Sequence, residues 1–107
     1  MLKKCGKIQK IGNCLMYTLL LSNKFEKSLL KIKSHKKFKK EIFNKVINTL
    51  LSGEKLSKKY KEHKLSGKYR GCFECHVQND ILLIYSFNNK KLYLYAIDIG
   101  THSELFE

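Results

Sequence analysis

The chain has 107 residues, which is enough for one domain with a single buried core and too few for two. Apolar residues make up 43% of it and proline is absent, so the composition excludes collagen-like and intrinsically disordered chains. The 22 lysines and arginines against 9 acidic residues give a net charge of +13, which indicates a polyanionic partner: nucleic acid, an acidic protein or an anionic membrane.

The N-terminal segment faintly resembles a secretory signal, because basic residues precede a short apolar stretch at residues 15–21. That stretch contains Tyr17 and Thr18 and is followed by Ser22 without a small-residue cleavage site, so we expect no secretion and place the protein in the cytoplasm. No apolar run approaches the roughly 20 residues of a membrane-spanning helix. We expect residues 15–21 to form the first strand, residues 1–15 to be an extension outside the core, and residues 16–107 to be one domain.

Two helices are predicted next. Asn23 followed by Glu26 resembles a capping box, and apolar residues between positions 25 and 30 predict a helix that ends near Lys33. Between residues 38 and 51, apolar residues recur at the spacing of one buried helical face, and Gly53 is a natural stop. The two helices should form an antiparallel hairpin, whose lysine-coated outer face is explained by solvation as readily as by RNA contact.

Three strands are predicted after the polar connection at residues 55–68. Residues 69–77 alternate, residues 81–87 are almost continuously apolar, and residues 92–99 alternate again, with polar turns between them. The order β-α-α-β-β-β predicts an α+β fold in which the helical hairpin covers one face of a small twisted sheet.

The first of these three strands carries polar side chains on one face. Arg70, Cys72, Glu74 and His76 occupy alternate positions and should lie on the surface that faces away from the helices. Cys72 and Cys75 form a C-x-x-C, which could be half of a zinc site or a redox motif. Because residues three apart in a strand point to opposite faces, buried free thiols are the favoured interpretation.

Three histidines are candidates for chemistry at loops or on this polar face. His102 follows the last strand inside Thr101-His102-Ser103-Glu104, a second capping box, where the helix dipole disfavours the charged imidazolium. His63, His76 and His102 with Asp80 could bind a metal ion, but none of the pairs has the short spacing of metal-ligand motifs. We therefore expect neither a metal nor another cofactor.

Three motifs in fixed order carry a family resemblance: K-E-H-K-L-S-G at residues 61–67, E-C-H-V-Q-N-D at 74–80 and G-T-H-S-E-L-F at 100–106. The chain from residue 16 onward closely resembles the YafQ branch of the RelE superfamily, the toxins of type II toxin–antitoxin pairs. The resemblance implies a helical hairpin on an antiparallel sheet, and a ribosome-dependent, metal-independent endoribonuclease that cuts mRNA in the decoding site and so inhibits translation.

The resemblance also implies roles for individual residues. His102 is expected to be the general acid, His76 and Asp80 the base or its orienting partner, and His63 a phosphate contact or a second proton carrier. Phe106 is expected to stack on a base, although it could equally close the end of the sheet. Further RNA contacts are expected from four residues nearby: Arg70, Glu74, Lys64 and Lys68.

The chain departs from the family at three positions. Asp98 and Phe73 stand where relatives commonly carry arginines, and Asn79 stands where a proline is frequent. Loss of an arginine removes charge stabilisation of the transition state. Because Asp98 should share a face with Leu94 and Ala96, close to His102, we expect Asp98→Arg to increase mRNA cleavage.

Two functions therefore remain open at this point: the ribosome-dependent ribonuclease, and a catalytically weak protein of the same fold that binds RNA or ribosomes. A free DNA-binding domain is disfavoured, because no recognition helix is apparent. The resemblance implies a small acidic antitoxin, dimeric and DNA-binding, as the partner of either one. Operator DNA would be contacted only through that antitoxin, and no membrane partner is expected.

Overall fold

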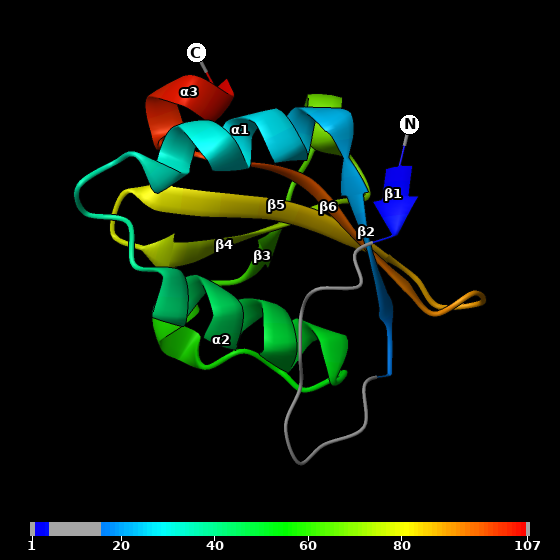
Figure 1. Ribbon diagram of the computed structural model, residues 1–107. Helices are drawn as coiled ribbons and strands as arrows, with labels where there is room; N and C mark the ends of the chain where they lie inside the picture. The colour runs from blue at the N-terminus through cyan, green and yellow to red at the C-terminus, as the bar shows by residue number, and fades with distance from the viewer. Residues whose placement is uncertain (1, 5–15, 107) are drawn as a thin grey trace.

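The computed structural model describes residues 2–4 and 16–106 (Figure 1). Among these residues, six strands form one sheet in the order β1-β2-β6-β5-β4-β3, accompanied by three α-helices and two short 3-10 helices. In chain order the elements are β1 (Leu2–Lys4), β2 (Thr18–Ser22), α1 (Asn23–Lys33), α2 (Lys40–Leu51), β3 (His63–Lys64), β4 (Phe73–Gln78), β5 (Ile81–Asn88), β6 (Tyr93–Gly100) and α3 (His102–Phe106).

The central sheet confirms the predicted α+β order. The strands β4, β5 and β6 form an antiparallel meander, and β2 pairs in parallel with β6 after the chain has crossed over through α1 and α2. Three elements that begin within the predicted polar connection were not anticipated: the two-residue strand β3 and the 3-10 helices at Lys58–Tyr60 and Gly67–Tyr69. The strand β3 pairs with β4 and adds a short edge to the sheet.

Both predicted helices are present, with small differences at their starts. The N-cap of α1 is Ser22, whose hydroxyl accepts from the backbone N–H of Phe25 at 2.9 Å, so the cap lies one residue before the predicted one. The helix α2 starts at Lys40, and Phe38 packs against the core from the loop before it. Gly53 adopts φ of 76°, which fits the predicted helix stop.

The main core lies between the two helices and one face of the sheet. Phe25 of α1 and Phe43 of α2 stack with ring centroids 6.3 Å apart, and Figure 1 shows the two helices on either side of the line of β5. The other face of the sheet carries a second apolar cluster of Tyr69, Leu82, Ile84 and Leu105. Strict alternation over residues 69–77, with Arg70 and Cys72 facing away from the helices, would place Tyr69 on the helix face, but the chain forms a 3-10 helix there and strand β4 begins only at Phe73.

A bulge in β6 changes the face of its last residues. Leu94 and Ala96 belong to the main core, whereas Ile84 of the second cluster pairs with Asp98 and Tyr85 pairs with Ala96. Ile97 is therefore the extra residue, and one extra residue moves the following side chains to the opposite face. The expectation that Asp98 shares a face with Leu94 and Ala96 was wrong for this reason.

The N-terminal extension falls mostly outside the described residues. Within it, the backbone of β1 pairs antiparallel with β2, with Leu2 opposite Ser22 and Lys4 opposite Leu20. The separation of residues 1–15 from the domain stays a prediction. In residues 2–4 and 16–106, no helix has the length and apolar character needed to cross a membrane.

Candidate active site

Two histidines and a buried glutamate meet on the sheet face opposite the helices. Glu74 of β4 is only 5% exposed, and its Oε1 lies 3.2 Å from Nε2 of His63 and 4.0 Å from Nε2 of His76. Register explains the first contact, because His63 of β3 stands directly opposite Glu74. Both imidazoles remain accessible, so the group presents two proton-carrying rings above one buried carboxylate.

The orientation of His63 is set by a backbone contact. Its Nδ1 lies 2.9 Å from the carbonyl oxygen of Lys61. A carbonyl oxygen can only accept, so Nδ1 carries a hydrogen and Nε2 is the nitrogen that faces Glu74. A fixed ring orientation is what proton transfer requires.

The second half of the site lies at the start of α3. The predicted capping box is formed at the start of this helix. Thr101 N–H donates to the Glu104 carboxylate at 2.9 Å, and Glu104 N–H donates to the Thr101 hydroxyl at 3.3 Å. The Thr101 backbone hydrogen bond and the Lys31 ammonium 2.9 Å away lower the pKa of Glu104. His102 is thereby placed, exposed, on the first turn, with its ring 5.2 Å from that of Phe106.

An aromatic pair extends this second half toward β4. Tyr69 meets Phe106 edge to face at 6.0 Å, and the ammonium of Lys68 lies 5.3 Å from the Tyr69 ring. Phe106 is 40% exposed, which leaves part of the ring free for stacking. The predicted RNA contacts Lys68 and Phe106 thus lie on one continuous patch with His102.

Strand register places the two halves on the same face of the sheet, with apolar residues of the second cluster between them. Leu82 of β5 stands between His76 on β4 and Gly100 on β6, and Gly100 directly precedes the turn to His102. Two strand spacings separate the backbones of His76 and Gly100 by about 10 Å. The register therefore brings the part of β4 that carries His76 within two strands of the segment that leads to His102.

Asp98 belongs to this face but not to the surface. It is 2% exposed, its Oδ1 accepts from the N–H of Ile99 at 2.8 Å, and its Oδ2 lies 3.3 Å from Nζ of Lys24. The hydrogen bond from Lys24 to Asp98 raises the pKa of that lysine, which donates to the Tyr69 hydroxyl at 3.5 Å as well. The position where the family resemblance led us to expect an arginine is therefore one half of an ion pair.

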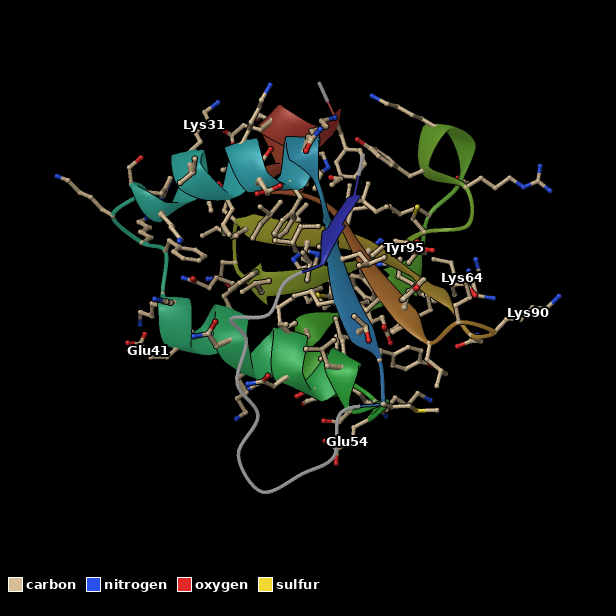
Figure 2. All side chains as sticks on the ribbon, turned by 45° about the vertical axis from the view of Figure 1, so that its right-hand side comes forward. Lys31, Glu41, Glu54, Lys64, Lys90 and Tyr95 are labelled. Carbon is tan, nitrogen blue, oxygen red and sulfur yellow. The ribbon has the colours of Figure 1, made fainter. Side chains whose placement is uncertain are left out.

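The remaining predicted residues are solvent-exposed. Asp80 lies at the turn between β4 and β5, Lys64 stands opposite the first residue of β4, and Arg70 follows the 3-10 helix that precedes β4. Figure 2 shows the Lys64 side chain reaching outward from the β3 edge. Glu74 is the exception: it was expected on the surface as an RNA contact, and it is buried beneath the imidazoles instead.

The cysteines of the C-x-x-C lie on opposite faces, as predicted. Cys75 is fully buried in the main core, where burial raises the pKa of its thiol to about 12, and Cys72 packs against the second cluster. Both are free thiols. Across residues 2–4 and 16–106, the structure contains no group of three or more His, Cys, Asp and Glu side chains close enough to hold a metal ion.

Sequence reasoning missed the contributions of Lys24 and Tyr69. Lys24 is one of 22 cations and lies 74 positions before Asp98, so no local pattern links the two. Tyr69 was assigned to the wrong face, since the 3-10 helix at Gly67–Tyr69 was not predicted. The positive φ of 88° at Gly71 fits the break before β4, and that glycine was the available signal.

Known proteins resemble the chain in sequence. Residues 17–107 match the family described as a bacterial toxin of type II toxin–antitoxin systems, YafQ. A Haemophilus influenzae protein that carries the name of a YafQ toxin is 39% identical over 41 residues, which are 38% of this chain and 40% of that relative.

Solved structures match over most of the chain. A metal-bound toxin from Helicobacter pylori is 35% identical, with a TM-score of 0.73 over 87% of this chain and all of that one. YafQ from E. coli strain BL21(DE3) is 26% identical, with a TM-score of 0.75 over 85% and 99% of the two chains. YafQ in the E. coli DinJ–YafQ complex is 27% identical, with a TM-score of 0.74 over the same shares.

Proposed function

The chain belongs to the YafQ family of bacterial toxins of type II toxin–antitoxin systems, and from this premise we propose that it is a ribosome-dependent endoribonuclease that inhibits translation. The observation that carries the proposal is that His63, Glu74 and His76 lie on the same face of the sheet as His102 and Phe106, with apolar residues of the second cluster between them.

The proposed reaction is a transfer of the scissile phosphate to the neighbouring 2′-hydroxyl. His76, with Glu74 beside it, removes the 2′-hydroxyl proton, and the oxygen then attacks phosphorus. His102 gives its proton to the departing 5′-oxygen as the phosphorus–oxygen bond breaks. His63 contacts the phosphate or takes part in the proton transfers. Asp80, at the turn that follows β4, supports the base.

The charge of the molecule supports an RNA substrate. Lys64, Lys68 and Arg70 are exposed; Lys64 stands opposite Phe73, the first residue of β4, and the other two precede that strand in the chain, so we expect them to hold the phosphates on either side of the cut. Phe106 would stack on a neighbouring base. Most of the cations are lysines, which read phosphates rather than base edges, so the ribosome rather than the chain would choose the site of cleavage.

The proposed protein partner is an acidic antitoxin. The E. coli relative YafQ forms a complex with DinJ, and a net charge of +13 makes this chain a suitable ligand for an acidic protein. We place the pair in the cytoplasm, where ribosomes are, and expect operator DNA to be contacted through the antitoxin.

The proposal is tested with purified protein and ribosomes programmed with a defined mRNA. We expect new 5′ ends within the decoding-site codon, mapped by primer extension. EDTA treatment of the protein should leave the cleavage rate unchanged once magnesium sufficient for the ribosome is restored, because imidazoles supply both proton transfers.

Two outcomes contradict this proposal. Stoichiometric zinc in the protein, with cleavage lost on its removal, would make the enzyme a metallonuclease. Inhibited translation without new 5′ ends would favour the second function, a ribosome-binding protein of weak activity. One structural observation favours that second function. Lys24 is already paired with Asp98, so its positive charge is engaged within the protein instead of being directed at an RNA phosphate.

A further inference from the structure

A buried tyrosine is hydrogen-bonded to the segment that carries His63. Tyr85 of β5 is 1% exposed and is held between Phe73, stacked at 5.8 Å, and Phe87, edge-on at 5.8 Å. Its hydroxyl donates to Oε2 of Glu62. Burial, together with this hydrogen bond, raises the pKa of Tyr85, so the phenol remains a donor throughout the physiological range.

Glu62 is thus hydrogen-bonded to Tyr85 in the core, and it is the residue that directly precedes His63 in the chain. The residue before it, Lys61, has the left-handed φ of 50°, and its N–H donates to the Lys58 carbonyl at 3.0 Å. A lysine in this conformation is strained and persists only where its surroundings hold it. The carbonyl of the same strained residue is the one that accepts from Nδ1 of His63.

Backbone pairing holds the C-terminal end of this segment. The strand β3 has two residues, both with exposed side chains, which stand opposite Glu74 and Phe73 of β4, and the N–H of Leu65 donates to the Cys72 carbonyl at 2.9 Å. Tyr60, just before the turn, is buried and fixes the other end of the segment. Between these two ends, the Tyr85–Glu62 hydrogen bond links the buried Tyr85 ring to the residue that precedes His63.

We propose that Tyr85 is a positioning residue: through Glu62 it holds the left-handed turn at Lys61 and so fixes the ring orientation of His63 toward Glu74. It touches no substrate and acts from the opposite face of the sheet. Its effect on cleavage rests on the proposed function, whereas its effect on the His63 ring does not.

The test replaces Tyr85 by phenylalanine, which keeps the volume of the core and removes one oxygen. We expect the ¹⁵N signals of the His63 imidazole, and their pH dependence, to change in the Tyr85→Phe protein. On programmed ribosomes, kcat should fall by about ten- to a hundredfold with KM little altered, because a misplaced proton carrier slows the reaction without weakening RNA binding.

The matched control is Tyr17→Phe, which removes the same atom from another tyrosine that packs against the main core. The Tyr17 hydroxyl donates to Oδ1 of Asn89 at 2.7 Å, in the turn between β5 and β6, and not to Glu62. Its His63 signals and kcat should equal those of the wild type. Equal values in Tyr85→Phe as well would overturn the proposal.

A second pair of variants keeps the test independent of any effect on folding. Glu62→Ala should reproduce the changes in the His63 signals, and Glu62→Gln should largely restore them, since an amide oxygen still accepts from the Tyr85 hydroxyl. Unaltered His63 signals in Glu62→Ala would contradict the proposed link. If the wild-type chain fails to cut RNA, the imidazole signals still decide this inference and only the proposed function is lost.

Discussion

Replacing His102 by alanine should lower the single-turnover rate of mRNA cleavage by about 100- to 10,000-fold, the range expected for removal of a general acid. The leaving 5′-oxygen would then depart without a proton. His102 is exposed on the first turn of α3, so the variant should keep its thermal midpoint. The measurement is cleavage on isolated ribosomes at saturating protein and fixed salt.

The matched control for this variant is His35→Ala. His35 follows α1, is exposed, and accepts through Nδ1 from the Lys37 N–H at 3.3 Å, without a contact to the candidate site. Its removal should leave the rate unchanged. If His102→Ala retained a rate within about threefold of the wild type, the acid would have to be another group.

Replacing Asp98 by arginine should destabilise the fold by about 3–5 kcal/mol, because it places a positive charge without a partner at a buried position. The sequence alone predicted a gain in cleavage instead. Asp98 is 2% exposed and its carboxylate pairs with Lys24, so an arginine there would place a second cation beside that lysine in a site too small for it. Thermal unfolding should show a midpoint lower by about 10 °C or more.

Two further proteins make the Asp98 measurement specific. Glu54→Arg changes the net charge equally at an exposed position labelled in Figure 2, and it should shift the midpoint little. Combining Asp98→Arg with Lys24→Glu restores opposite charges and should recover part of the loss. An Asp98→Arg protein with the wild-type midpoint and faster cleavage would show that the arginine expected from the family fits here after all.

Much of the fold was predictable because its signals are local. The helix α1 ends at Lys33 as the apolar spacing indicated, and the stop at Gly53 and the capping box of α3 depend on residues within a few positions of each other. The bulge at Ile97 has no such signal, since an extra residue is detected only by what stands opposite it. The inference from strict alternation that Asp98 shares a face with Leu94 and Ala96 was therefore wrong.

Part of the candidate site was likewise predictable from the sequence, and part was not. The types and order of His63, His76 and His102 were readable from the motifs, and Glu74 was placed on the correct face of β4. Its burial was not readable, because it depends on β3, a two-residue strand, covering that edge of the sheet. The contact between Tyr85 and Glu62 likewise joins residues 23 positions apart that no periodic pattern relates.

The substrate itself provides the sharpest test of acid–base cleavage through the 2′-hydroxyl. Ribosomes are programmed with an mRNA whose decoding-site codon is either all ribose or carries 2′-deoxyribose at each of its three nucleotides. We expect rapid cleavage of the first mRNA and none of the second, with equal binding of the protein to both complexes, since only RNA supplies the attacking oxygen. Cleavage of the deoxy codon at the same rate, or of neither mRNA by ribosome-bound protein, would contradict this mechanism.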